Sequence, residues 1–354
     1  MKLKVGNITK IRTGKLDANA SSPDGKYPFF TCSKNPLKIS TYSYDCECVL
    51  VAGNGDLNVK YYNGKFDAYQ RTYIIEDNSN GLLYMPYLYY FFEGYIEKLR
   101  KQSIGGVIKY IKLDNLTNAL IELPSIEEQK YIVSLINISS ELIDLRRETI
   151  NKLDSLVKAR FIEMFGDPVS NSKHLPLKTL PQLGTFGRGV SKYRPRNAPE
   201  LLNGPYPLIQ TGDIANSELY IKNYNSTYSE VGLKQSKMWD KGTLCITIAA
   251  NIAKTAILQF DACFPDSVVG FNGNNFTNNI FIYYWFSFFQ EILENQAPES
   301  AQKNINLKIL SELQIITPDI IEQNKFVHFV RHVDKSRFDI KKSIIELERE
   351  VVYD

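Results

Sequence analysis

The chain has 354 residues, of which 44% are hydrophobic and 12% are aromatic, and its 42 basic and 39 acidic residues leave a net charge of +3. This length favours two domains, and this apolar content is ample for burial, so neither domain need be disordered. A net charge so near zero excludes neither a DNA partner nor a protein partner, so the local distribution of charge has to decide between them.

The cysteines and the apolar runs set the expected compartment. The five cysteines are an odd number, and the only close pair, Cys46 and Cys48, lacks the spacing of zinc ligands, which predicts reduced thiols. The start of the chain carries no signal-peptide run, and the aromatic runs at 87–92 and 280–289 are too short to cross a bilayer. We therefore expect a soluble, cytoplasmic protein without a membrane partner.

Residues 1–123 predict a mixed α/β domain. The β-rich runs at 49–52 and 72–75 are bounded by turn residues, and residues 84–100 predict a helix with a dense aromatic face. The Gly-Asn-Gly-Asp stretch at 53–56 predicts a turn, since a lone Gly-x-Gly in a polar stretch is seldom a cofactor loop.

Residues 124–166 predict the first of two long helices. Ser125 would cap it, and Glu128, three residues further on, would reach back to the N–H of Ser125. From Ile132 to Val157, a helix of about 39 Å, apolar residues recur at alternating steps of four and three, as in a coiled-coil seam. The seam consists of Ile132, Ile136, Ser139, Ile143, Arg146, Ile150, Leu153 and Val157.

Residues 167–317 predict a polar linker and a second domain that repeats the first. Phe-Asp-Ala at 66–68 recurs at 260–262, and the aromatic run at 89–92 recurs at 283–286, in both cases 194 residues later. Nearer the start of each copy the offset shortens to 179 and then to 175, so the second copy carries extra residues in its middle.

Residues 318–354 predict the second long helix, with Asp319 and Glu322 in the places of Ser125 and Glu128. Its seam lies 194 residues after the first and consists of Phe326, Val330, Val333, Arg337, Ile340, Ile344, Leu347 and Val351. Two unrelated amphipathic helices, each packed on its own domain, would explain neither the shared offset nor the shared caps.

We therefore expect an α+β fold with two α/β domains in tandem repeat. Two long helices would separate and span the domains and form an antiparallel coiled coil with pseudo-two-fold symmetry. Ser139, Arg146 and Arg337 interrupt the seams and would fix the register of the pair at some cost in stability.

Motifs for catalysis and metal binding are missing from this sequence. It contains no Asn-Pro-Pro-Tyr or Asp-Pro-Pro-Tyr run for amino methylation of a base, no Walker A loop, no Gly-x-Ser-x-Gly elbow and no His-Glu-x-x-His. His328 and His332 share a helix face, but no carboxylate is placed to complete a metal site, and a solvated polar flank is the better interpretation. The sequence thus predicts no cofactor, no metal and no catalytic residue in this chain.

The basic residues occupy the same place in both copies. Residues 1–16 and 168–199 hold five and six basic residues without one acid, which suits a polyanion better than a small ligand. Arginine suits guanine, glutamine suits adenine, and lysine and arginine also contact phosphates. The candidate DNA-binding residues are Lys15, Tyr69, Gln70, Arg71, Lys109, Arg188, Lys192, Arg194, Arg196 and Lys303.

With these features established, the chain resembles the DNA-specificity subunit of type I restriction-modification systems over essentially its whole length. The motifs that carry the resemblance are LPSIEEQ at 123–129, TPDIIEQ at 317–323, LVKARFIEMFGDP at 156–168, GRGVS at 187–191 and SAQKNI at 300–305. The first copy departs from the last motif, since it has GGVIKYI at 105–111. The resemblance therefore supports a role for Lys303 more strongly than for Lys109.

The resemblance implies two target-recognition domains that each read half of a split double-stranded DNA site. The helices would measure the gap and dock two methyltransferase subunits, with restriction or translocase subunits as further partners. S-adenosylmethionine, Mg²⁺ and ATP would act only in those partners, and this chain would be non-catalytic. The candidate partner-binding residues are Glu128, Gln129, Phe161, Phe165, Glu322 and Gln323.

Two other functions stay open from the sequence. One is a self-sufficient DNA-modifying enzyme with unfamiliar motifs, and the other is a coiled-coil adaptor that binds proteins. Specific DNA binding would weaken steeply with salt, whereas an apolar protein interface would not.

Overall fold

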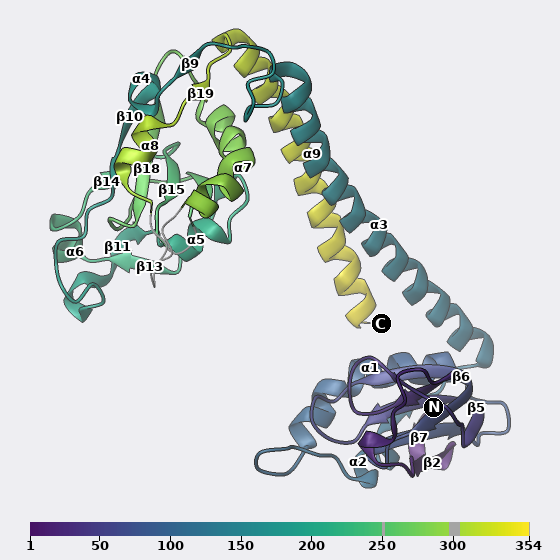
Figure 1. Ribbon diagram of the computed structural model, residues 1–354. Helices are drawn as coiled ribbons and strands as arrows, with labels where there is room; N and C mark the ends of the chain where they lie inside the picture. Colours follow the sequence, from purple (N-terminus) through teal and green to yellow (C-terminus); the bar gives the residue numbers. More distant parts are fainter. Residues whose placement is uncertain (250–251, 297–304, 354) are drawn as a thin grey trace. The chain divides into compact units, whose positions relative to one another are not determined.

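The computed structural model describes residues 1–249, 252–296 and 305–353 (Figure 1). Its contacts divide the chain into unit 1, Met1–Arg146 with Ser343–Asp354, and unit 2, Arg147–Lys342. Each unit contains part of both long helices, whereas the division expected from the sequence falls at the helix ends. Within the described ranges, no helix is both long enough and apolar enough to span a membrane.

Unit 1 is built on a six-stranded sheet of order β2-β7-β5-β6-β3-β4, in which only β3 and β6 pair in parallel. The strands are β2 (Thr9–Thr13), β3 (Tyr27–Phe30), β4 (Leu37–Ile39), β5 (Tyr44–Ala52), β6 (Val59–Ala68) and β7 (Thr72–Asp77). A small sheet joins β1 (Lys2–Lys4) to β8 (Leu120–Glu122), and η1 (Val5–Asn7), η2 (Ala18–Ala20) and α2 (Leu113–Thr117) complete the unit.

Strand alternation explains why both faces of this sheet are buried. Val49 and Val51 face α1 (Met85–Gln102) and pack with its Phe92, whereas Cys48 and Leu50 belong to a second core on the opposite face. The predicted helix and both predicted strands are therefore present.

Unit 2 repeats this plan with its sheet divided in two. The orders are β10-β18-β15-β16-β12 and β13-β11-β17-β14, and β9 pairs with β19 as β1 pairs with β8. The strands are β9 (Leu177–Lys178), β10 (Gly184–Arg188), β11 (Leu202–Leu208), β12 (Tyr220–Ile221), β13 (Ser226–Tyr228), β14 (Met238–Trp239), β15 (Leu244–Thr247), β16 (Thr255–Leu258), β17 (Ala262–Cys263), β18 (Val268–Gly273) and β19 (Ile315–Ile316). The short helices are α4 (Leu180–Leu183), η3 (Pro199–Leu201), α5 (Thr211–Ala215), α6 (Glu230–Lys234) and α8 (Leu307–Glu312), and α7 (Asn279–Gln296) is the counterpart of α1.

The division of the sheet follows from one interrupted strand. In unit 1, β6 is continuous and its end pairs in parallel with β3. In unit 2 the same strand is broken into β16 and β17, and only β17 pairs in parallel with β11. The elements from α5 to β14 stand where unit 1 has β4 alone, which is where the shift in offset placed the extra residues.

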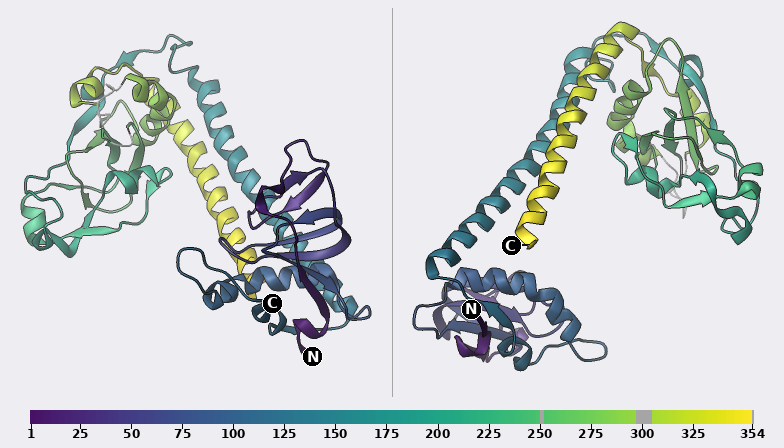
Figure 2. Two further views of the ribbon diagram at one scale, coloured as in Figure 1. Left: turned by 60° about the horizontal axis from the view of Figure 1, so that its bottom comes forward. Right: turned by 180° about the vertical axis from the view of Figure 1, so that it is seen from behind.

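The long helices are α3 (Ile126–Phe165) and α9 (Ile320–Tyr353), which run side by side (Figures 1 and 2). Every seam residue from 132 to 157 and from 326 to 347 is buried or half-buried. Arg337 of α9 bonds Asp154 of α3, and Arg146 of α3 donates to the Ser343 carbonyl of α9 at 3.0 Å. Because one residue number falls as the other rises, the helices are antiparallel, as expected. Two of the three polar seam residues thus bond across the helix pair.

The two helix starts differ in their caps. In α3 the Glu128 carboxylate accepts from Ser125 N–H at 3.0 Å, and Ser125 Oγ accepts from Glu128 N–H at 3.3 Å, which completes the predicted capping box. In α9 the Asp319 carboxylate accepts from Ile321 N–H at 2.8 Å, while Glu322 pairs with Lys325 instead. The expectation that Glu322 reaches back to its cap was therefore wrong.

Gln129 and Gln323, expected to contact partner subunits, are instead buried structural residues with no exposed surface. The Gln129 side chain donates to the carbonyls of Leu82 and Pro124 and accepts from Tyr84 N–H. Gln323 makes the equivalent set with the carbonyls of Phe276 and Pro318 and with Thr277 and Asn278. Each glutamine thereby ties the first turn of a long helix to the segment that leads into α1 or α7.

Phe161 and Phe165, also expected at a partner interface, are buried within unit 2. The Phe161 ring stacks on Phe281 of α7 with centroids 5.3 Å apart, and it meets Phe326 of α9 edge-on at 5.4 Å. The end of α3 is therefore part of the core of unit 2. Of the six predicted partner residues, Glu322 is half-buried and Glu128 is exposed.

Candidate nucleic-acid interface

In unit 1, four backbone segments that are distant in sequence meet at the loop edge of the sheet, where β2 and β5 end and β7 begins. Gly14 N–H donates to the Thr72 carbonyl at 3.0 Å, and Gln70 N–H donates to the Leu16 carbonyl at 2.9 Å. Gly53 N–H donates to the Arg71 carbonyl at 2.8 Å. Gly55 N–H donates to the Lys109 carbonyl at 2.9 Å, which joins the fourth segment to the other three.

This arrangement brings together the predicted DNA-binding residues of the first copy. Lys15, Gln70, Arg71 and Lys109 have exposed side chains, and Tyr69 is half-buried. In the part of the chain that the structure describes, no salt bridge is formed by Lys15, Arg71 or Lys109. Other basic residues of the stretch 1–16 are neutralised, since Arg12 pairs with Glu76 and Lys2 pairs with Glu122.

Close backbone approach explains two glycines of this edge. A Cβ on Gly14 would lie 2.2 Å from the Ala68 carbonyl oxygen, and a Cβ on Gly53 would lie 2.3 Å from the Arg71 carbonyl oxygen. Gly55 has a φ of +69°, and the 53–56 stretch forms the predicted turn.

The second copy builds the equivalent edge with different side chains. Gly189 N–H donates to the Val268 carbonyl at 2.8 Å, as Gly14 does to Thr72, and Ile305 N–H donates to the Ile248 carbonyl. Arg188, Lys192, Arg194 and Arg196 are all exposed. Lys303, the predicted counterpart of Lys109, lies outside the described residues.

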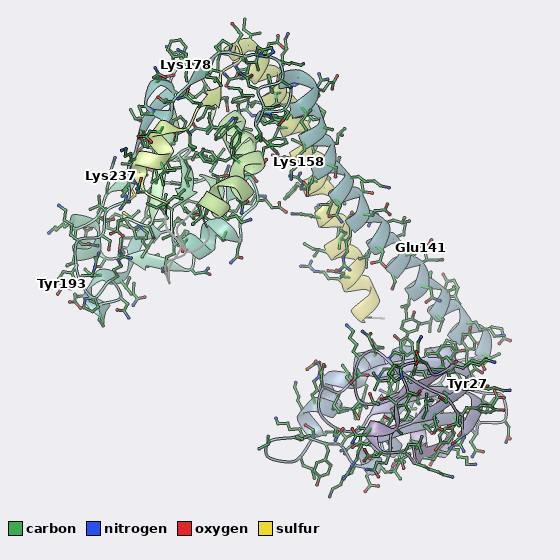
Figure 3. All side chains as sticks on the ribbon, viewed as in Figure 1. Tyr27, Glu141, Lys158, Lys178, Tyr193 and Lys237 are labelled. Atoms are coloured by element: carbon green, nitrogen blue, oxygen red, sulfur yellow. The ribbon has the colours of Figure 1, made fainter. Side chains whose placement is uncertain are left out.

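Residues near β14 hold the basic loop 188–196 in place. The Gln235 side-chain oxygen accepts from Lys192 N–H at 2.7 Å and from Tyr193 N–H at 3.0 Å, and Ser236 Oγ donates to the Val190 carbonyl. Figure 3 shows Tyr193 at the end of the domain near α6. Its hydroxyl donates to Glu200 at 2.9 Å, and this hydrogen bond raises the pKa of Tyr193.

An acidic residue that the sequence analysis did not predict at this site contacts the basic loop. Asp266, which precedes β18, pairs with Arg196 at 2.5 Å and lies 3.6 Å from the guanidinium of Arg194. The stretch 168–199 contains no acidic residue, but Asp266 neutralises part of its positive charge in the folded chain. The backbone hydrogen bonds Gly14–Thr72 and Gly189–Val268 correspond, which places Asp266 with Gln70 and Ser267 with Arg71. No signal in the sequence predicts this match, because the offset of 194 would match Gln70 to Phe264.

Two hollows flank Arg196. One of about 290 Å³ is lined by Arg188, Arg196, Ile248, Ala249, Asp266, Ser267, Ile305 and Asn306. The other, of about 270 Å³, lies between Arg196, Tyr228, Gln210 and the segment around Pro265. Polar groups with both donors and acceptors thus surround an exposed arginine, which suits contacts to base edges or phosphates.

The described residues contain no group of three or more His, Cys, Asp and Glu side chains placed to hold a metal ion. His328 and His332 lie together on α9 with ring centroids 4.5 Å apart. The interface is therefore defined by its basic and polar loops.

Most of the chain matches one family of known proteins. The family described as "Type I restriction modification DNA specificity domain" matches residues 1–155 and 179–349, which is most of the chain. The chain belongs to this family. The type I restriction enzyme EcoDI specificity subunit of Escherichia coli is 26% identical over 373 residues, which cover 97% of this chain and 83% of that protein.

Solved structures share the fold of this specificity-family chain. The type I restriction-modification S subunit of M. genitalium aligns over 99% of this chain and 93% of its own, with 15% identity and a TM-score of 0.61. A chain from a structural study of assembly and conformational transition of the type I restriction-modification system aligns over 99% and 95%, with 16% identity and a TM-score of 0.66. The resemblance drawn from the sequence motifs is confirmed.

Proposed function

We propose that this chain reads a split DNA site, with each domain reading one half, and directs methyltransferase subunits to it. The observation that supports this function most directly is the repeated interface edge. In both copies the loop after the first strand of the main sheet is hydrogen-bonded to the first residue of β7 or β18, and both edges carry exposed cations. Two equivalent edges with different side chains suit two different half-sites.

Within each half-site, cations would position phosphates and a few loop side chains would read base edges. Lys15 and Lys109 would be the phosphate contacts in the first copy, and Gln70 and Arg71 would read bases. In the second copy, Arg188, Lys192, Arg194 and Arg196 share these tasks. Lys303 has the corresponding role by its position in the repeat.

The partners in this proposal are two methyltransferase subunits and, where cleavage occurs, restriction or translocase subunits. The chain itself would be a non-catalytic, cytoplasmic component, and S-adenosylmethionine, Mg²⁺ and ATP would act in the partner subunits. Glu128 and Glu322 keep their proposed place in partner contacts, since neither is buried.

A map of N6-methyladenine tests this function. DNA from a methylation-free host would be sequenced with the neighbouring methyltransferase, with and without this chain. We expect a gapped two-part motif only when both are present. Exchange of residues 1–123 for those of another family member should change one half of the motif and preserve the other half and the gap. A chimera that altered both halves, or modification by this chain alone, would contradict the proposal.

Salt dependence separates the two kinds of contact in the first copy. We expect Lys109→Ala to weaken binding to all DNA sequences alike and to lower the slope of log affinity against log salt by about 1, because one phosphate contact is lost. Arg71→Ala should instead relax the preference at one base. Lys98→Ala, a change to an exposed lysine on α1, serves as the control, and a slope unchanged by Lys109→Ala would remove Lys109 from the interface.

A further inference from the structure

Asp266 is an unexpected residue to find on a DNA-binding edge. A carboxylate repels phosphates, so an acid at this surface lowers non-specific affinity for DNA. In unit 1 the corresponding position is Gln70, and the cations around it have no acidic partner within the described residues. The negative charge of Asp266 therefore needs an explanation by a role that a neutral glutamine, as at Gln70, could not fill.

The contacts of Asp266 indicate what that role is. Its Oδ1 lies 2.5 Å from Nη2 of Arg196, and its Oδ2 lies 3.6 Å from Nη2 of Arg194. A charge-assisted bond to one nitrogen restricts the rotation of a planar guanidinium. The remaining donors of Arg196 have no partner in the described part of the chain, and its side chain is 46% exposed.

The surroundings of Arg196 show where those donors can bind. Arg196 lines both hollows, and the larger one also contains Arg188, Ser267 and Asn306. Arg188 and Asn306 supply further donors, and Ser267 and Asn306 also supply acceptors. A guanidinium held between two polar hollows has a donor edge free for a flat ligand with two adjacent acceptors.

We propose that Asp266 is a positioning residue that orients Arg196 to read a guanine in the half-site of the second domain. Guanine presents N7 and O6 as adjacent acceptors in the major groove, and arginine binds both at once only when its plane is correctly turned. This inference rests on the proposed function, because it assigns one base contact within the DNA interface. Arg194, the more distant of the two arginines, shares the same carboxylate.

The test compares Asp266→Asn with Arg196→Lys in the complete chain, using N6-methyladenine maps obtained with the neighbouring methyltransferase. Asp266→Asn keeps the shape of the side chain and removes its charge. Arg196→Lys keeps the positive charge and removes the ability to donate two hydrogen bonds in a bidentate geometry. The half-site of the second domain is the one that survives exchange of residues 1–123. Asp240→Asn removes an exposed acid of the same domain outside both hollows and is the matched control.

We expect the second half-site to contain a guanine at which both variants lose discrimination by roughly tenfold, while the first half-site and the gap stay as in the wild type. The double variant should lose little more than either single variant, because both changes disable one contact. Asp240→Asn should give the wild-type motif.

Several results would overturn the role of Asp266 and leave the proposed function intact. These are a second half-site without guanine, relaxation at different positions in the two variants, or a uniform fall in methylation without a change of motif. The last result would make Asp266 a structural residue of the loop. Absence of any gapped motif with the wild-type chain and its methyltransferase would instead count against the proposed function itself.

Discussion

Phe161→Ala is expected to lower the free energy of unfolding of unit 2 by about 3–5 kcal/mol. The Phe161 ring is fully buried and lies within 5.5 Å, centroid to centroid, of Phe165, Phe281, Phe288 and Phe326. Its removal leaves a cavity among aromatic rings from three different helices, which cannot all close in to fill it. The end of α3 would then lose its main attachment to the domain.

Tryptophan fluorescence measures this effect in unit 2 alone, because both tryptophans of the chain, Trp239 and Trp285, lie there. A urea titration of the full chain, followed by fluorescence, gives the midpoint and slope of the transition. Phe338→Ala on α9 is the control, since that residue is 59% exposed and loss of its ring should change stability little. Equal midpoints for Phe161→Ala and wild type would show that α3 does not depend on this aromatic core.

A paired insertion into the two long helices is expected to lengthen the gap of the methylated motif by about two base pairs. Four residues add about 6 Å to a helix, and one strand of B-DNA advances about 3.4 Å per nucleotide. The insertions would follow Asn151 in α3 and Asp339 in α9. Both contacts across the helices, Arg337 with Asp154 and Arg146 with Ser343, are then preserved, because each lies on one side of the paired insertions.

The insertion in α3 alone is the informative comparison. It moves Asp154 away from Arg337, whose side chain is only 8% exposed, and leaves a buried charge without one of its partners. This variant should be less stable than the paired one, in which a four-residue insertion is accommodated by local unwinding. A motif whose gap stayed the same in a stable paired variant would contradict the ruler role of the helices.

The repeat, the long helices and the domain class could all be predicted from the sequence. Their signals are local or periodic: Ser125 and Glu128 are three residues apart, and the seam recurs every three or four residues. Such patterns depend on backbone geometry that neighbouring residues control among themselves. The exposed cations of unit 1 could also be nominated, since Lys15, Arg71 and Lys109 stand in stretches with obvious charge.

Other features were decided by the tertiary structure. Gln129 and Gln323 look like polar surface residues in a helix, but they are buried because carbonyls 47 residues earlier in the chain need donors there. Asp266 neutralises Arg196 from 70 residues away, since the break between β16 and β17 and the length of the following loop set where it lies. Local patterns determine which elements form, whereas burial and charge pairing depend on which distant elements meet. The repeated architecture therefore follows from local patterns in the sequence, whereas contacts between distant segments set which polar side chains stay exposed.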